Sequence, residues 1–246
     1  MDTLHKIFNA VENDKWSGSQ TLSDTLIYSL ILYYPQLSPL EKEQIGERLL
    51  KLVNQKNYFA LFNHLATTLA VSDDWSQTLK EYQAAYKNVN QNITDQFIEV
   101  IHYEPKTFLL HSNSGTVTAV FKHLAAGGYK ASIFQTRSSP DNEGLVQSKK
   151  LQEFGFIVTE VDDAPPDTLF NQIDILVTGV DLILPLEFIN KKGTRFLAEK
   201  IYSLGKPYFV LADPRKFSNT FPSTPLPPTF ECIPRNLITT IITGNH

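Results

Sequence analysis

The sequence predicts an α/β protein in which a helical domain precedes a mostly parallel β-sheet domain, and three observations support this. Residues 1–114 contain two glycines, whereas the remaining 132 residues contain nine. The glycine-poor part carries apolar residues at helical spacing, which is typical of amphipathic helices. The glycine-rich part alternates short runs rich in Val, Ile and Phe with helical segments, the pattern of βαβ units. We therefore assign a helical domain to residues 1–104 and an α/β domain to residues 105–246.

The first domain reads as a succession of helices. An amphipathic opening segment breaks at residues 16–18, and a second helix, TLSDTLIYSLILYY, is stopped by Pro35. Pro39, followed by acidic residues, opens a third helix, since proline and acid both favour the first helical turn. NYFALFNHLATTLAV and the long stretch WSQTLKEYQAAYKNVNQNITDQFIEVI follow. We expect about five helices here and no catalytic residue.

Five apolar runs predict the strands of the second domain. In chain order, they lie within FLLHSNSGT, YKASIFQT, FIVTEV, DILVTGV and PYFVLAD. Helical segments separate them, the clearest being at about residues 145–154 and 194–203. In parallel sheets, ligands bind beyond the carboxyl ends of the strands, where the winding direction changes. Polar residues follow several of these strand ends, so we expect them to share one cleft.

The composition bounds the setting and the partners of the chain. Its 246 residues can bury a substantial core, and its net charge of −4 and pI near 5.9 come without a basic cluster, unlike nucleic-acid-binding surfaces. The single cysteine, Cys232, excludes an intrachain disulfide and a cysteine-based zinc site. Neither a signal peptide nor a membrane-spanning run is evident. We expect a cytoplasmic protein that uses no metal and no cofactor and binds no nucleic acid or membrane.

The segment FLLHSNSGT is the most informative motif. It reads as a strand, a tight polar turn and a helix start, with small side chains where the backbone comes close to another group. Successive N–H groups in such a turn point into one concavity, and the helix dipole adds partial positive charge. The turn comprises Ser112, Asn113, Ser114, Gly115 and Thr116, and we predict that it binds an anion, with phosphate as the natural guest. An ordinary βα turn capped by Ser and Asn would read the same way.

Two charged residues follow other strands. Arg137 could grip an anionic group with its planar guanidinium, or it could pair with Asp141 or Glu143 on its own loop. Asp181 closes an otherwise apolar strand, where desolvation would raise its pKa toward a useful acid–base range. Alternatively, Asp181 caps a loop or pairs with Lys191 or its neighbour.

The remaining polar residues at strand ends have both a functional and a structural interpretation. Asn190 and Lys191 belong to a polar turn that places a cation before a helix. Asp213 could bind a ligand or pair with Arg215 or Lys216. His111 is more often a structural histidine, held in one tautomer by its hydrogen bonds, than a base.

Six segments occur in the order seen in one protein family. They are HSNSGT, the loop from Arg137 to Gly144, VTGVD, NKKGT, ADPRKF and FECIPRNLITTIIT. The chain resembles the family of the alpha, beta and delta subunits of translation initiation factor 2B, whose relatives include methylthioribose-1-phosphate isomerase and ribose-1,5-bisphosphate isomerase. The resemblance covers residues 95–243 well and the helical part more loosely. It implies a Rossmann-like second domain, dimers built through that domain, and a sugar phosphate bound in the cleft.

The resemblance also implies roles for individual residues, and the sequence departs from some of them. In the isomerases a cysteine stands at Ser112, and Asp181 matches the partner aspartate. A serine hydroxyl is a far poorer acid than a thiol, so proton transfer at Ser112 would need a neighbouring base. His111 is adjacent, but neighbours in an extended segment point apart. The arginine-bearing first-half segment of methylthioribose-1-phosphate isomerase is also missing, and the usual RPxxxG-type loop is two residues longer here.

Two functions therefore stay open. The first is an initiation-factor-2B-like protein that binds a phosphorylated sugar or nucleotide and acts through assembly with itself or partners. The second is an aldose–ketose isomerase of a sugar 1-phosphate, with Asp181 as general acid/base and Ser112 beside it. In either case the ligand would meet Asn113, Ser114, Gly115, Thr116, Arg137, Asn190 and Lys191. The apolar residues among the prolines of LPLEFI and FPSTPLPPTF, together with the resemblance, predict self-association through the second domain.

Overall fold

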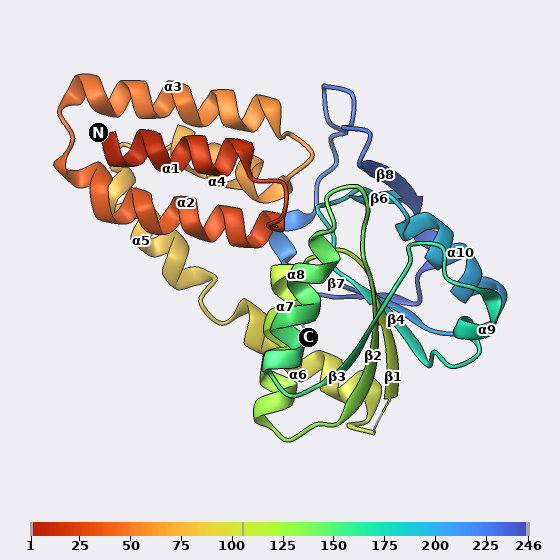
Figure 1. Cartoon of the computed structure of the whole chain (residues 1–246). Helices are drawn as coiled ribbons and strands as arrows, with labels where there is room; N and C mark the ends of the chain where they lie inside the picture. The colour runs from red at the N-terminus through yellow and green to blue at the C-terminus, as the bar shows by residue number, and fades with distance from the viewer. Residues whose placement is uncertain (1, 105, 245–246) are drawn as a thin grey trace.

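The computed structural model describes residues 2–104 and 106–244, in which a bundle of helices lies beside an α/β part (Figure 1). The helices are α1 (Asp2–Asn13), α2 (Ser19–Tyr33), η1 (Tyr34–Gln36), α3 (Pro39–Gln55), α4 (Ala60–Ala70), α5 (Trp75–Ala85), α6 (Val89–Ile101), α7 (Gly115–Ala126), α8 (Glu143–Glu153), α9 (Asp167–Phe170), α10 (Thr194–Ser203), η2 (Pro214–Lys216) and η3 (Arg235–Leu237). The strands are β1 (Lys106–Leu110), β2 (Ala131–Thr136), β3 (Ile157–Val161), β4 (Ile175–Thr178), β5 (Leu182–Ile183), β6 (Glu187–Lys191), β7 (Tyr208–Leu211), β8 (Phe230–Pro234) and β9 (Thr240–Ile242).

The observed helices of the first part agree with those predicted from the sequence, except in one stretch. Helix α3 begins at Pro39 behind a capping box, in which Ser38 and Glu41 satisfy each other's backbone N–H groups. The segment expected as one long helix from Trp75 is two, α5 and α6, separated by a turn at residues 86–88. Six α-helices therefore precede residue 105 within the described chain, rather than about five.

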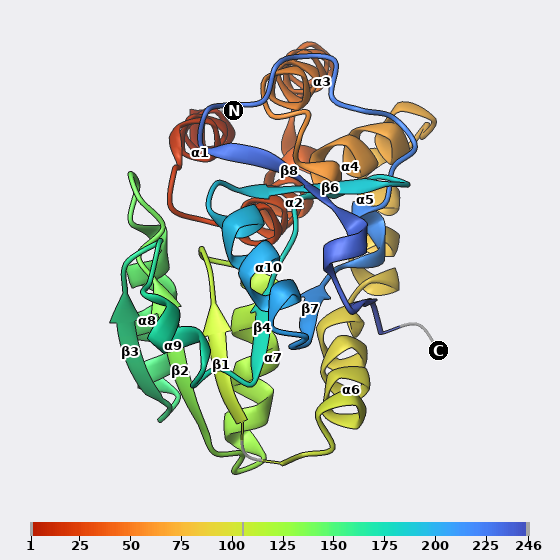
Figure 2. The same cartoon turned by 90° about the vertical axis from the view of Figure 1, so that its right-hand side faces the viewer.

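The six-stranded sheet is parallel throughout, in the order β3-β2-β1-β4-β7-β9. Its central strands are buried on both faces, and their alternate residues enter different cores. Phe108 and Leu110 of β1 pack with α6 and α7, whereas Leu109 packs with α10 on the opposite face. Figure 2 shows α10 in front of the sheet and α7 behind it. The predicted α/β architecture is thus confirmed.

The winding direction of this sheet changes between β1 and β4. From β1 the chain proceeds outward through β2 and β3, and it then returns to β4 and proceeds to β7 and β9 on the other side. The carboxyl ends of β1 and β4 are therefore neighbours, with Leu110 in register with Val177. The loops that leave these two strands diverge and open a crevice at this edge.

A second, antiparallel sheet of β5, β6 and β8 was not predicted. One of its faces, with Leu182 and Ile189, joins the core of the helices, and the other, with Phe188 and Ile233, joins the core under α10. The apolar residues of LPLEFI are accordingly buried inside the chain, except for Leu186, which is 85% exposed. Their expected exposure was wrong, so this motif gives little support to self-association.

The apolar cores do not follow the division at residues 104 and 105. Ile93, Phe97 and Ile101 of α6 belong to the core of the parallel sheet, although they precede that division. The antiparallel sheet contributes in turn to the core of the helices. The two-domain assignment stays a prediction. Within residues 2–104 and 106–244, no helix combines the length and apolar character needed to cross a membrane.

Candidate functional site

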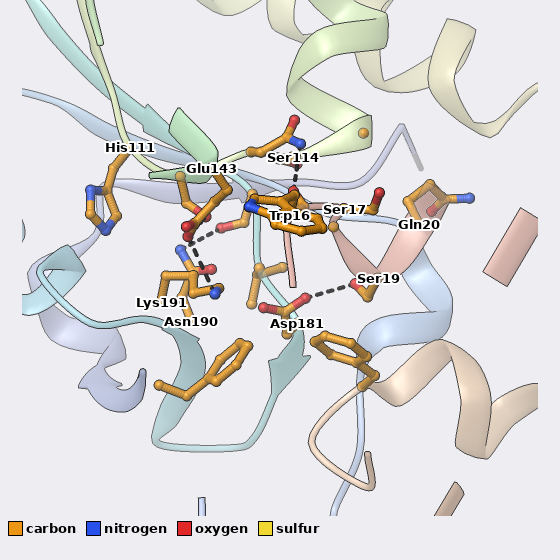
Figure 3. Close-up of a pocket in the computed structure, with 18 of the residues that line it drawn as sticks. Trp16, Ser17, Ser19, Gln20, His111, Ser114, Glu143, Asp181, Asn190 and Lys191 are labelled. Carbon is orange, nitrogen blue, oxygen red and sulfur yellow. Dashed lines mark hydrogen bonds and ion pairs between the residues drawn. The ribbon is translucent and has the colours of Figure 1, made fainter. Parts of the chain in front are cut away.

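A cavity lies at the crevice between the ends of β1 and β4. It encloses about 440 Å³ of space not filled by atoms, open solvent at its mouth included. Its walls come from the loops after β1 and β4, from the end of β6, from the start of α8, and from residues 15–20, which lead into α2 and form its start (Figure 3). Phe59 and Phe230 line its mouth and a wider hollow outside it. The cleft expected at the strand ends is present, but the helical part supplies one of its walls.

The predicted anion turn lies in this cavity, with part of its backbone already engaged. The N–H of Ser112 donates to Oγ of Ser138 at 2.8 Å, and the N–H of Ser114 donates to Oε1 of Gln147 at 2.8 Å. Oγ of Ser114 caps α7. Among the described residues, nothing accepts a hydrogen bond from the N–H of Gly115 at the start of α7. An anion would therefore meet the first N–H groups of the helix rather than the whole turn.

The start of α2 packs directly against this turn. Nδ2 of Asn113 donates to the carbonyl of Trp16 at 2.7 Å, which fixes the loop that precedes α2. A Cβ at Gly18 would lie 2.6 Å from the carbonyl oxygen of Asn113, so only glycine allows this approach. Gly18 gives α2 no side-chain cap. The amino ends of α2 and α7 thus lie beside the same cavity, and their dipoles add partial positive charge to it.

Asp181 enters the cavity just beyond β4. Its Oδ1 accepts a hydrogen bond from Oγ of Ser19 at 2.7 Å, across 162 residues of sequence. Burial raises the pKa of Asp181, an effect that the nearby Lys216 and the Ser19 hydroxyl partly oppose. Lys216 is itself buried, with its ammonium donating to the carbonyl of Val180 at 2.5 Å, and burial lowers its pKa.

Glu143, the first residue of α8, lies beside the turn. Its Oε1 accepts a hydrogen bond from Oγ of Ser112 at 3.1 Å and lies 3.3 Å from Nζ of Lys191. Lys191 also lies 3.7 Å from Asp141, which borders the hollow outside the cavity. Burial raises the pKa of Glu143, although Lys191 and Ser112 act against this. A carboxylate of α8 thus lies within hydrogen-bond distance of the Ser112 hydroxyl.

His111 lines the cavity, and both of its ring nitrogens have hydrogen-bond partners. Its Nε2 lies 3.0 Å from the carbonyl oxygen of Lys192, an acceptor, so this nitrogen carries the proton and Nδ1 accepts from the Thr136 hydroxyl at 2.7 Å. Burial lowers the pKa of His111 to about 4, and the ring is neutral at pH 7. A Cβ at Gly193 would lie 3.0 Å from the ring, and the φ of Gly193 is +102°.

The other candidates divide between the cavity and its surroundings. Asn190 lines the cavity, and its Nδ2 donates to the carbonyl of Gly179 and to the Thr194 hydroxyl, both at 3.2 Å. Thr116 is fully buried in the first turn of α7 and does not line the cavity. Arg137 is also outside it: its side chain is about half exposed and lies 3.8 Å from Asp162, not from its expected partners.

Asp213 has a structural partner. Its two carboxylate oxygens accept hydrogen bonds from Nε and Nη2 of Arg215 at 2.9 and 2.5 Å. The guanidinium of Arg215 in turn stacks on the ring of Tyr86, with 4.1 Å from its central carbon to the ring centroid. This buried pair holds η2, which carries Lys216 into the cavity.

Sequence reasoning missed three groups of the cavity, namely Ser19, Glu143 and Lys216. Ser19 opens a helix of the part in which no functional residue was expected, and Lys216 was considered only as a partner of Asp213. Glu143 was considered only as a partner of Arg137. Three lysines and two carboxylates line the cavity, with Lys15 at its exposed rim, and the described chain contains no cluster of His, Cys, Asp or Glu suited to a metal. The arrangement can hold an anion and exchange protons with it.

Comparisons with known proteins agree with this architecture. The sequence profile of the Initiation factor 2 subunit family matches residues 3–226. A Pyrococcus furiosus protein named as translation initiation factor eIF-2B subunit 2-like is 24% identical over 221 residues, 86% of this chain and 78% of its own. Ribose 1,5-bisphosphate isomerase of Methanocaldococcus jannaschii is 23% identical over 235 residues, 88% of this chain and 74% of its own. The solved structure of the Pyrococcus horikoshii translation initiation factor eIF-2B has a TM-score of 0.87 at 20% identity, covering 99% of this chain and 96% of that one.

Proposed function

Since the chain belongs to the Initiation factor 2 subunit family, we propose that it binds a phosphorylated sugar or nucleotide in the cavity and acts through assembly with itself or with partners. The observation that carries this proposal is that two helix amino ends meet Lys191 and Lys216 in one cavity, with Lys15 at its exposed rim. Unpaired N–H groups and ammonium groups together attract a phosphate, and the polar walls suit the hydroxyl groups attached to it.

Calorimetric titration with sugar phosphates and nucleoside monophosphates tests the binding. Lys191→Gln should weaken the binding of the best ligand about 10- to 100-fold, because one charge-assisted contact is lost. Lys149→Gln is the matched control, since Lys149 is exposed on α8 and does not line the cavity. Affinity should also rise as salt falls. If no phosphate ester binds the parent protein, or if both variants bind equally well, the ligand site is elsewhere.

Assembly is the second part of the proposal. Leu186 is 85% exposed and Phe221 is 48% exposed, so apolar surface remains on the α/β part. In the family that this chain resembles, dimers are built through the same part, and this supports self-association there. Light scattering at tens of micromolar should give at least a dimer mass, and a monomer mass would refute self-association.

One observation favours an isomerase of a sugar 1-phosphate as a second candidate. Asp181 is buried, faces the cavity with one oxygen held by Ser19, and has a raised pKa, as a general acid requires. Incubation of the protein with ribose 1,5-bisphosphate or methylthioribose 1-phosphate tests this candidate. We expect Asp181→Asn to abolish any conversion and to keep ligand affinity. Absence of turnover of both compounds by the parent would leave the binding protein as the function.

A further inference from the structure

A second carboxylate faces the cavity besides Asp181. Glu143 is 2% exposed and lines the cavity from the start of α8, and Figure 3 shows it with Asp181 among the groups that surround this space. Its Oε1 is held by the Ser112 hydroxyl and by Lys191. Its Oε2 is buried and has no hydrogen-bond partner among the described residues.

An unpartnered buried carboxylate oxygen is costly, so such an atom commonly faces a proton or a donor that the bound state supplies. Lys191 and Ser112 both hold the other oxygen and thereby fix the rotation of the carboxylate. A purely structural ion pair would be expected to use both oxygens. The free Oε2 is therefore the feature of Glu143 that the fold leaves unexplained.

Glu143 and Asp181 have parallel surroundings. In each case one carboxylate oxygen accepts a serine hydroxyl, from Ser112 in the first and from Ser19 in the second. In each case a lysine is close, Lys191 beside Glu143 and Lys216 beside Asp181. In both carboxylates one oxygen is held, and the other has no hydrogen-bond partner among the described residues.

We propose that Glu143 is a second proton-transfer group, acting with Asp181 on a bound aldose 1-phosphate. This proposal rests on the isomerase candidate above, and it supplies the proton carrier that a serine at position 112 cannot be. Ser112 is then a positioning residue that orients Glu143. His111 does not compete for the role, because both of its ring nitrogens are engaged by Thr136 and the Lys192 carbonyl.

The reaction balances without an oxidant or reductant. Glu143 takes the proton from C2, and the electron pair of that C–H bond forms a C1=C2 double bond. The bond between C1 and the ring oxygen breaks, and Asp181, as the carboxylic acid, protonates that oxygen. The C2 hydroxyl then returns a proton to Asp181 as C2 becomes a carbonyl, and Glu143 returns its proton to C1. The product is the ketose with its phosphate still on C1.

The test combines affinity with isotope exchange. Ribose 1,5-bisphosphate is incubated with the protein in D₂O, and mass spectrometry and NMR measure conversion and deuterium at C1, while calorimetry measures affinity. Glu143→Gln should lower conversion and deuterium incorporation at least about 100-fold and keep affinity within a few-fold, because the amide preserves shape but carries no proton. Ser112→Ala should lower the exchange, but less than Glu143→Gln does, because Lys191 still holds Oε1 of Glu143. Asp141→Asn is the matched control, since Asp141 also faces Lys191 but does not line the cavity.

The outcomes separate this proposal from those it rests on. Failure of the parent to bind the bisphosphate overturns the proposed ligand site and this role with it. Binding without conversion or exchange overturns the isomerase and the role of Glu143, and it leaves the binding protein. Conversion with Glu143→Gln as active as the parent overturns the role of Glu143 alone, whereas the fraction of deuterium at C1 measures only how often the proton on Glu143 exchanges with solvent before its return. Thermal unfolding of each variant confirms that it is folded.

Discussion

Replacing His111 by glutamine should make the free energy of unfolding depend less on pH below about 7. His111 is buried and neutral, and its two ring nitrogens are engaged by the Thr136 hydroxyl and the Lys192 carbonyl. Adding a proton would put a charge in an apolar site and turn the acceptor nitrogen into a donor that faces the hydroxyl. Of the nearby charges, Asp163 favours protonation and Lys191 opposes it, and burial outweighs both.

The pKa of His111 sets the size and sign of this effect. The pKa is about 6.5 in the unfolded chain and about 4 in the folded protein. At pH 7 the folded protein does not bind the proton, and the unfolded chain binds it only in roughly a quarter of the molecules. As the pH falls below 6.5, the unfolded chain takes up the proton and the folded protein does not, so the free energy of unfolding falls. The loss is about 1.4 kcal/mol per pH unit and reaches roughly 3 kcal/mol near pH 4.

Urea unfolding at pH 7 and pH 5 measures the difference. The parent should lose about 2 kcal/mol more than His111→Gln between these two values, because only the parent contains the titrating ring. Asp181 and Glu143 have raised pKa values and act in the opposite direction, but they are present in both proteins and cancel in the comparison. Parallel stability curves for the two proteins would refute the buried neutral state of His111.

Two further changes test other parts of the site. Asp181→Asn should stabilise the protein increasingly as pH rises above 4, because the raised pKa of Asp181 means that its ionised form destabilises the fold. Denaturant unfolding of the parent and the variant at pH 5 and pH 8 measures this. A difference in free energy of unfolding that does not widen between these two pH values would refute it. Gly193→Ala should cost about 1–3 kcal/mol and more than Gly128→Ala in denaturant unfolding, because both have positive φ but only a Cβ at Gly193 meets the ring of His111. Equal costs would show that the ring accommodates the methyl group.

The parallel sheet could be predicted because its signal is local. Each central strand is buried on both faces where it crosses the sheet, so its sequence contains an unbroken apolar run, as in Phe108, Leu109 and Leu110 of β1. The antiparallel strands have no such signal. Strand β5 consists of Leu182 and Ile183 alone, and β8 follows a proline-rich segment that reads as a loop. These strands form where the two cores meet, because one face of their sheet packs in the core of the helices and the other in the core under α10.

The site was predictable where its residues lie at or just beyond the ends of strands, as Ser112 and Asp181 do after β1 and β4 and Asn190 does near the end of β6. Glu143 escaped prediction because its position depends on the turn before α8, in which Asn142 has a φ of +55°. Ser19 could not be found because its contact with Asp181 spans 162 residues. Arg137 illustrates the converse: its place after a strand was correctly identified, but the direction of a long side chain depends on neighbours such as Asp162.

The sharing of the antiparallel sheet between the two cores has a consequence for biosynthesis. The nascent helices leave the ribosome well before Leu182, Ile189 and Phe230, which cover their apolar face in the finished protein. At roughly 5–20 residues per second, the roughly 145 residues between the end of α5 and β8 take on the order of ten seconds to make. During that time the helices offer an open apolar face to chaperones. The last quarter of translation therefore closes the core that the first quarter begins.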